Sequence, residues 1–139
     1  MLCTNEVARG FEPGAHASTF GGNPFATRAG LAVFDVIERD GLIENAAKMG
    51  TYLNERLAAL AGTTPGVLGA RGRGLMQALV VDEAVDRAAI GAAARARGLL
   101  LTLAGHDALR LVPPLIVGKA HIDEAVELLA DAVREVATS

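Results

Sequence analysis

The sequence predicts an α/β fold in which two helices lead into a small open sheet that carries helices on one side. Near the start, apolar residues recur at steps of three and four along two consecutive segments, which is the period of amphipathic helices. Further along, two pairs of short apolar runs flank glycine-containing turns, which is typical of strands. A helical pattern follows each pair. The order after residue 66 is therefore β-β-α-β-β-α.

The first helix is expected over residues 24–38. Asn23 can cap its N-terminus, and Pro24 suits the first helical position because its fixed φ fits a helix and its missing N–H is not needed there. The tripeptide "RDG" ends it. The apolar side chains repeat at helical spacing: Phe25, Ala29, Ala32, Val33, Val36 and Ile37.

The second helix is expected over residues 42–61, until "AGTTPG" breaks the pattern. After Pro65, "VLGARGRG" and "LMQALVV" read as two short strands, with "RGRG" as the turn between them. Helical spacing returns over residues 83–97, and Gly98 suits the position just beyond a helix C-terminus.

The third and fourth strands are expected in "LLLTLA" and "ALRLV", separated by "GHD". A proline pair stops the second of them, since proline cannot donate to a sheet. The last helix is expected over residues 120–136, with acidic residues in its first turns that suit the helix dipole and read as a solvated face: Asp123, Glu124 and Glu127.

Composition places this chain among globular proteins that meet a partner. Of 139 residues, 51% are hydrophobic and 21% charged, which is enough apolar material for a core. The mean hydropathy of +0.33 is high for a monomer in water. We expect that the small sheet does not cover both leading helices and that these helices need a larger body to pack on. We therefore expect the uncovered surface to meet another chain or domain.

Several functions and locations are disfavoured. No segment is long and apolar enough to span a bilayer, and the N-terminal stretch carries charges that a signal peptide would lack, so a cytoplasmic location is expected. The single cysteine, Cys3, fits a reducing compartment. A net charge of −3 without a basic run argues against nucleic-acid binding.

Local motifs indicate little chemistry by themselves. The three histidines, His16, His106 and His121, lack metal-ligand spacing, so no metal site is expected. Cys3 reads as incidental rather than nucleophilic. Ser18 lacks the Gly-x-Ser-x-Gly frame of a hydrolase.

Two features leave alternatives open. The loop "GAHASTFGGNP", residues 14–24, can present the hydroxyls of Ser18 and Thr19 and backbone N–H groups to an anion, or it can be a plain tight connection. Arg110 is a lone charge in the apolar stretch "ALRLVPPLI". It must either reach solvent from a sheet edge or face a partner carboxylate, and spacing alone does not separate these readings.

Four separate motifs carry a family resemblance. In order, "STFGGNP", "RGRGLM", "RLVPPLI" and "HIDEAVELLADAV" are similar to the C-terminal part of the class III (ornithine-type) aminotransferases, and the acetylornithine enzymes among them match best. Ala17 departs from the glycine usual in that group, and Gln77 stands in a stretch that is usually apolar or glycine. The resemblance implies the C-terminal part of the fold type I architecture of pyridoxal-phosphate enzymes. Residues 1–62 would then end the large domain, and residues 63–139 would form the small domain.

The resemblance also implies roles for particular residues. Thr19, with Ser18 beside it, would bind the phosphate of the pyridoxal 5'-phosphate held by a partner subunit, and Arg110 would bind a substrate carboxylate. The Schiff-base lysine of the family has no counterpart, because Lys48 and Lys119 both lack its glycine-rich context.

The expected function is that of an aminotransferase part. The reaction implied is amino transfer between N-acetylornithine and 2-oxoglutarate in arginine biosynthesis, by a homodimer or with a separate large-domain chain. The chain alone is expected to be inactive. The alternative is a truncated, non-catalytic association module, or a remnant of an ornithine or 4-aminobutyrate aminotransferase.

Overall fold

The structure is a computed structural model that describes residues 3–12, 14 and 17–137. It divides into two compact units, Met1–Arg39 and Asp40–Ser139, each of which is described by itself. None of the described helices is long and apolar enough to cross a membrane.

The first unit contains α1 (Asn5–Ala8) and α2 (Pro24–Arg39). The predicted start of α2 is confirmed, because Asn23 Oδ1 accepts a hydrogen bond of 2.9 Å from the backbone N–H of Ala26, and Pro24 is the first helical residue. The short helix α1 was not predicted. Its N-cap is Thr4, whose hydroxyl oxygen accepts a hydrogen bond from the backbone N–H of Val7 at 3.4 Å.

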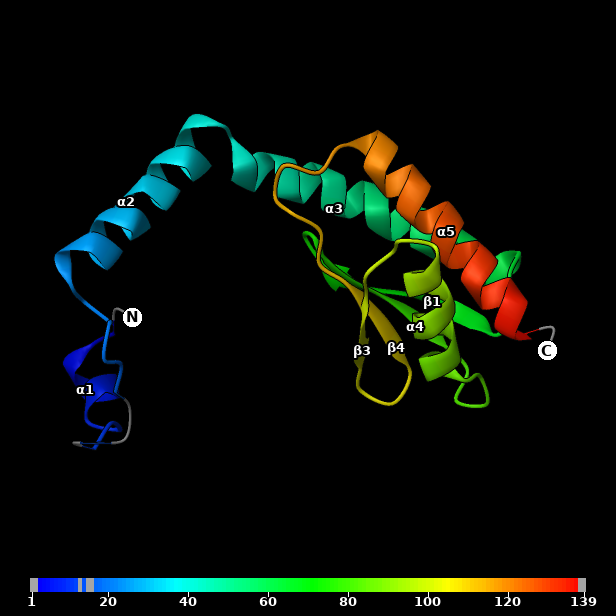
Figure 1. Ribbon diagram of the computed structural model, residues 1–139, viewed down its shortest axis with the longest axis horizontal. Helices are drawn as coiled ribbons and strands as arrows, with labels where there is room; N and C mark the ends of the chain where they lie inside the picture. The colour runs from blue at the N-terminus through cyan, green and yellow to red at the C-terminus, as the bar shows by residue number, and fades with distance from the viewer. Residues whose placement is uncertain (1–2, 13, 15–16, 138–139) are drawn as a thin grey trace. The chain divides into compact units, whose positions relative to one another are not determined.

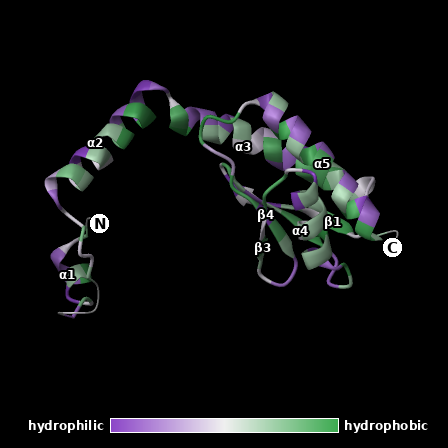
Figure 2. Ribbon diagram, in the orientation of Figure 1, coloured by the Kyte–Doolittle hydropathy of each residue, from purple (hydrophilic) through white to green (hydrophobic). Residues whose placement is uncertain are grey.

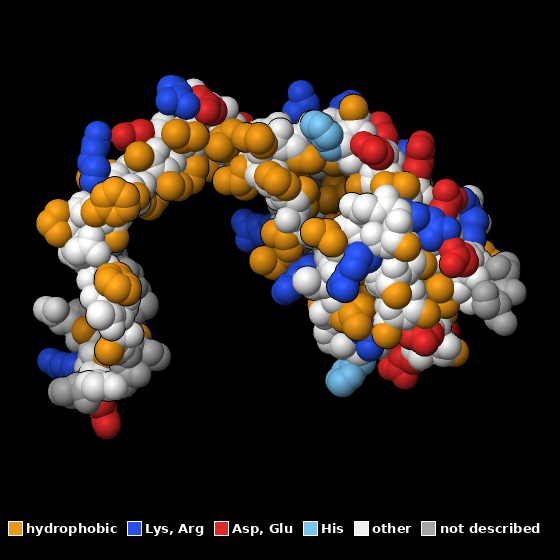
Figure 3. Space-filling view, in the orientation of Figure 1, with side chains coloured by type: hydrophobic (Ala, Val, Ile, Leu, Met, Phe, Trp, Pro, Cys, Tyr) orange, Lys and Arg blue, Asp and Glu red, His pale blue; other side chains and the backbone are white. Residues whose placement is uncertain are grey.

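No residue of α2 is buried. The ring of Phe25 is 86% exposed and that of Phe34 is 66% exposed. Hydrophobic side chains run along the helix in the space-filling view, with charged side chains beside them (Figure 3). The predicted uncovered apolar surface is therefore present on this helix.

The second unit is built on a four-stranded antiparallel sheet in the order β1-β2-β4-β3. Its strands are β1 (Val67–Arg73), β2 (Met76–Val81), β3 (Thr102–Ala104) and β4 (Ala108–Leu111) (Figure 1). The predicted β-β-α-β-β-α order is confirmed. β4 lies inside the sheet, between β2 and β3.

Three helices cover one face of this sheet. Helix α3 (Leu42–Ala58) packs on β1 and β2, α4 (Arg87–Ala96) packs on β3 and β4, and α5 (Lys119–Ala137) packs against both helices. Hydrophobic and hydrophilic residues alternate around α5 (Figure 2). The core gathers its largest fully buried side chains from all these elements: Leu53, Leu57, Leu79, Val81, Ile90, Leu109, Ile122, Leu129 and Val133.

The sheet covers the second of the two leading helices but not the first, so the expectation that it does not cover both is confirmed. The expectation that the second helix also needs a larger body is wrong. The expected boundary between the end of a large domain and a small domain, at residues 62 and 63, stays a prediction. The two compact units of this chain divide between Arg39 and Asp40. The reason is that α3 buries Leu42, Met49 and Leu53 in the core it shares with the sheet.

The predicted turn in "RGRG" is wrong in its position. Strand β1 continues to Arg73, which is paired with Met76, so only Gly74 and Leu75 connect the two strands. Gly74 has a φ of +52°, which favours glycine. The two arginines therefore belong to the strand and project from the sheet.

Three further boundaries differ from the sequence prediction. Helix α3 ends at Ala58 rather than at residue 61, and a short 3-10 helix, Ala59–Gly62, follows it. Helix α4 begins at Arg87 rather than at residue 83, because the carboxylate of Asp86 caps the N–H groups of Ala88 and Ala89. Strand β3 begins at Thr102 rather than at residue 99. Gly98 has a φ of +87°, as expected beyond the end of a helix.

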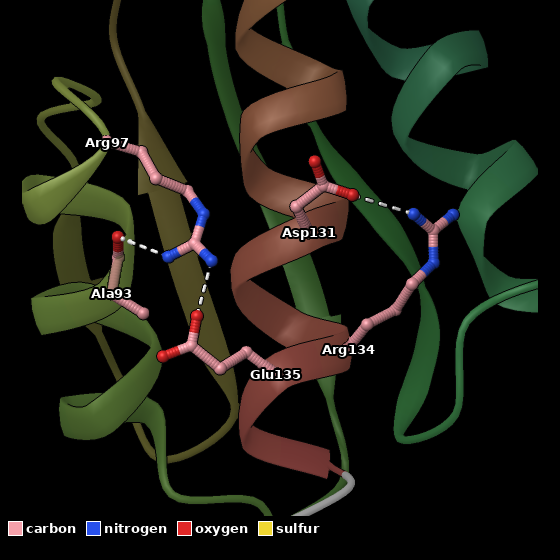
Figure 4. A network of polar contacts seen from close by, with 5 residues as sticks. All are labelled: Ala93, Arg97, Asp131, Arg134 and Glu135. Atoms are coloured by element: carbon pink, nitrogen blue, oxygen red, sulfur yellow. Dashed lines mark hydrogen bonds and ion pairs between the residues drawn. The ribbon is translucent and has the colours of Figure 1, made fainter.

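Polar contacts at the surface connect α4 with α5 (Figure 4). The guanidinium of Arg97 donates to the backbone oxygen of Ala93 at 3.0 Å and also pairs with Glu135 of α5. On α5 itself, Arg134 pairs with Asp131 at 3.0 Å. Because these pairs are largely exposed, each is expected to add little to the stability of the fold.

Candidate functional site

The candidate site is the sheet face that the helices leave open. In the strand register, Arg71 is paired with Ala78, Ala78 with Arg110, and Arg110 with Thr102. Residues that are directly paired across antiparallel strands project from the same face. One row of side chains thus crosses all four strands, with an arginine on each side of a small alanine.

Arg110 is exposed at the centre of this open face. It reaches solvent from an inner strand rather than from a sheet edge. Its Nε donates to the hydroxyl oxygen of Thr102 at 3.1 Å, and among the described residues it has no carboxylate partner. The guanidinium can therefore receive an anion from outside this chain segment.

The guanidinium of Arg71 forms an ion pair with a carboxylate of its own chain, Asp107. Its two terminal nitrogens each donate to one carboxylate oxygen of Asp107, at 2.7 Å in both cases. This hydrogen-bonded pairing lowers the pKa of the Asp107 carboxyl and raises the pKa of the Arg71 guanidinium.

A second arginine, Arg87, contacts the turn that contains Asp107. Asp107 lies in the turn between β3 and β4, and Arg87 Nη1 donates to the backbone oxygen of Gly105 in that turn at 3.0 Å. Sequence reasoning missed both contacts. The residues are 36 and 18 positions apart, so no local pattern could have indicated them.

The second part of the candidate site is the loop before α2. Ser18 and Thr19 are exposed, and the described residues provide no hydrogen-bond partner for either hydroxyl. The loop turns tightly here, because the N–H of Gly21 donates to the backbone oxygen of Ser18 at 3.3 Å and Gly22 has a φ of +75°. The amide of Asn23 also donates to the backbone oxygen of Phe20 at 2.5 Å.

This loop and Arg110 belong to different compact units. Each presents polar groups that can bind an anion: two hydroxyls on a tight turn in the first unit, and one guanidinium on the open sheet face in the second. The arrangement within each unit favours recognition of phosphate or carboxylate groups.

Both lysines of the chain lie on helices of the second compact unit. Lys48 is exposed on α3, and Lys119 lies at the start of α5 with its ammonium 4.8 Å from the centre of the Tyr52 ring. Neither stands in a glycine-rich loop, as the sequence indicated.

The remaining residues that the sequence singled out are the histidines and the cysteine. Within the described residues, no group of histidine, cysteine, aspartate and glutamate is arranged to hold a metal ion. His106 and His121 are exposed, His16 lies outside the described residues, and Cys3 is exposed.

One acidic residue departs from the expected solvated face. Asp123 is half-buried and accepts a hydrogen bond from the Tyr52 hydroxyl at 2.7 Å, while Arg56 pairs with the same carboxylate oxygen at 2.9 Å. The hydrogen bond to Asp123 is the main cause that raises the pKa of Tyr52. These contacts join α3 to α5, so we assign them to packing rather than to chemistry.

Comparison with known proteins adds an independent observation. A family model described as Aminotransferase class-III matches residues 1–133. An acetylornithine aminotransferase from Gloeobacter violaceus is 49% identical over 130 residues, which cover 92% of this chain and 32% of the relative.

Two solved structures are also similar. The acetylornithine aminotransferase from Elizabethkingia anophelis is 29% identical with a TM-score of 0.78, over 96% of this chain and 36% of that one. The ornithine aminotransferase from Toxoplasma gondii, described with partial occupancy of PLP at its active site, is 28% identical with a TM-score of 0.79, over 96% of this chain and 32% of that one. The chain therefore spans about a third of the length of these relatives.

Proposed function

Because this chain belongs to the class III aminotransferases, we propose that it is the C-terminal part of a pyridoxal-phosphate-dependent enzyme that exchanges an amino group between N-acetylornithine and 2-oxoglutarate. The acetylornithine aminotransferases among its relatives support this choice of amino donor. Ornithine and 4-aminobutyrate are the alternative donors. The single, exposed cysteine favours a cytoplasmic setting for the reaction.

The observation that best supports this function is that the Arg110 guanidinium is exposed and has no acidic partner among the described residues. Both substrates carry carboxylates, and the planar guanidinium can bind a carboxylate through two parallel hydrogen bonds. Arg110 is exposed on an inner strand and has no acidic partner among the described residues, whereas Asp107, in the turn between β3 and β4, is bound by Arg71. We assign to Arg110 the binding and orientation of the substrate carboxylate.

The loop residues fit the phosphate of the implied cofactor. Ser18 and Thr19 present hydroxyls that lack partners among the described residues, on a turn made tight by Gly21 and Gly22. A hydroxyl can donate to a phosphate oxygen, and such hydrogen bonds to charged groups are the strong ones. When bound, pyridoxal phosphate supplies the electron sink that stabilises negative charge at the substrate Cα. In this proposal the cofactor belongs to a partner subunit.

The proposal predicts that this chain does not react alone. The lysines present, Lys48 on α3 and Lys119 on α5, lie outside the kind of loop that would carry the covalent attachment of the cofactor. We therefore expect neither a covalent cofactor adduct at one lysine nor amino transfer from the 139-residue chain, at any cofactor concentration.

A second candidate function is association without chemistry. It is favoured by α2, which carries several exposed large apolar side chains and buries none of its residues. Such a surface is costly in water at roughly 25 cal/mol for each Å² of apolar area. A homodimer, or a complex with a separate large-domain chain, would cover it.

A reconstitution experiment tests the proposed function. The chain is mixed with, or fused behind, the upstream part of the Gloeobacter violaceus relative, and pyridoxal phosphate is added. We expect visible absorbance from bound cofactor together with glutamate formation from N-acetylornithine and 2-oxoglutarate. Assembly without cofactor binding or turnover would favour the association module instead. Turnover with ornithine or 4-aminobutyrate but not with N-acetylornithine would change the amino donor.

A further inference from the structure

We infer that Thr102 is a positioning residue for Arg110 and holds its guanidinium so that the two terminal nitrogens face an incoming substrate carboxylate. The inference rests on the proposed role of Arg110 in substrate binding. It concerns how this side chain is oriented before the substrate arrives.

The sheet register brings the two residues together. Thr102 and Arg110 are direct partners on the antiparallel strands β3 and β4. Side chains of such partners project from the same face with Cβ atoms about 4.5–5.5 Å apart. The Thr102 hydroxyl oxygen consequently lies 3.1 Å from Arg110 Nε and accepts its hydrogen bond.

This contact selects one edge of the guanidinium. A carboxylate can pair side-on with Nε and one terminal nitrogen, or end-on with both terminal nitrogens. Because the Nε–H of Arg110 already donates to Thr102, only the end-on edge remains with both of its donors available. The structure therefore favours end-on binding of the substrate carboxylate.

The other neighbours of Arg110 do not orient it. Ala78, its partner on the β2 side, is small and apolar. Beyond Ala78, Arg71 already binds both oxygens of Asp107, so that carboxylate is not offered to Arg110. Thr102 is the described side chain that hydrogen-bonds to the Arg110 guanidinium.

The role can be tested in the fusion with the upstream part of the Gloeobacter violaceus relative, using steady-state kinetics with 2-oxoglutarate. Thr102→Val keeps the shape and the strand propensity but removes the acceptor. We expect KM for 2-oxoglutarate to rise about 3- to 10-fold with little change in kcat, because a freed side chain must be ordered again at each binding event. Thr102→Ser keeps the hydroxyl and should restore most of the affinity. The control is Thr51→Val, an exposed threonine on α3 that should change neither constant.

A second measurement uses the 139-residue chain itself. The Nε–H resonance of Arg110 in a ¹⁵N-correlated NMR spectrum, assigned by its loss in Arg110→Lys, reports the hydrogen bond directly. We expect Thr102→Val to shift this resonance and to speed its exchange with water, while Thr102→Ser leaves it close to that of the unchanged chain. This readout does not depend on assembly of the fusion.

The outcomes separate the two proposals. If Arg110→Ala raises KM but Thr102→Val does not, the positioning role is wrong while the substrate role of Arg110 stands. If Arg110→Ala leaves KM unchanged, the proposed role of Arg110 fails. A fall in kcat and in thermal stability with both Thr102 variants, including the serine, would show a structural role and overturn the inference. An unshifted Nε–H resonance in Thr102→Val would overturn it as well.

Discussion

Gly50 of α3 and Gly74 of the β1–β2 turn approach so closely that a Cβ atom at Gly50 would lie 2.2 Å from the backbone oxygen of Gly74. The turn backbone cannot yield as a flexible side chain could, since it is fixed by the strands on both sides. Helix α3 therefore contacts the hairpin at a position where only glycine fits.

We predict that Gly50→Ala destabilises the chain by about 1–3 kcal/mol, because the added methyl group must push α3 away from the hairpin. Urea denaturation measures the change. The matched control is Gly91→Ala in α4, where the nearest atoms lie 3.9 Å from the added Cβ. That variant should be neutral or more stable by up to about 1 kcal/mol, because alanine favours helix. Equal effects of the two substitutions would contradict the close contact.

The second prediction concerns Gln77, which is only 3% exposed and lies next to this contact. Its amide nitrogen donates to the backbone oxygen of Gly74 at 2.7 Å, and its amide oxygen accepts from Asn54 at 2.8 Å. Gln77→Leu leaves the backbone oxygen of Gly74 and the side-chain amide of Asn54 without the hydrogen bonds that Gln77 makes to them. We therefore expect a loss of about 1–3 kcal/mol in the free energy of unfolding. A double-mutant cycle with Asn54→Ala measures the coupling, and additive effects would show that the pair is not coupled.

The third prediction is a pH dependence that arises from Arg71 and Asp107. The pKa of Asp107 is lowered in the folded chain, so the pair stabilises the fold above the unfolded carboxyl pKa of about 3.9, and this contribution is lost as pH falls through the lower folded pKa. Asp107→Asn should lower the melting temperature at neutral pH, and the difference from the unchanged chain should shrink in acid. Glu83→Gln, an exposed control, should show no such trend. A constant difference at all pH values would refute the ion pair.

The fourth prediction separates the two anion-binding places in the assembled enzyme. Thr19→Ala should weaken retention of pyridoxal phosphate, because it removes a hydrogen bond to a charged group of about 1.5–3 kcal/mol. Arg110→Ala should instead retain the cofactor and raise KM for 2-oxoglutarate, and Arg110→Lys should rescue it only in part because an ammonium lacks the planar fork. Cofactor dissociation constants measure the first effect, and steady-state kinetics measure the second. Release of the cofactor by Arg110→Ala, with unchanged substrate kinetics, would show that Arg110 does not bind the substrate carboxylate.

The fifth prediction is that the isolated chain self-associates at micromolar concentration. Val33 and Val36 are exposed on α2 at neighbouring positions of its apolar face. Val33→Ser combined with Val36→Ser should shift sedimentation toward monomer, whereas the surface control Glu38→Ser should not. A monodisperse monomer before any substitution would contradict the prediction.

Local sequence signals located most of the elements. Helix α2 follows from Asn23, Pro24 and the three- and four-residue spacing of its apolar side chains, because capping and amphipathicity are properties of neighbouring residues. The strand order along the chain, the helices after each strand pair and the family also follow from motifs within short segments.

Boundaries were less predictable where two local preferences compete. The glycines of "RGRG" favour a turn, yet pairing with β2 extends β1 through Arg73 and leaves only two residues to turn. Sheet hydrogen bonds formed by residues of both strands outweigh the turn preference of one.

The sequence by itself predicted the helices from α2 onward, the order of helices and strands after residue 66, the family and the singular position of Arg110 in an apolar run. Only the tertiary structure decided that Thr102 accepts a hydrogen bond from Arg110, that Arg71 pairs with Asp107, and that Gln77 donates a hydrogen bond to Gly74. These contacts depend on the strand register and on how α3 packs on the hairpin, which join residues up to 36 positions apart. Helical periodicity and capping act within a few residues, so they carry no information about which distant side chains the sheet places opposite one another.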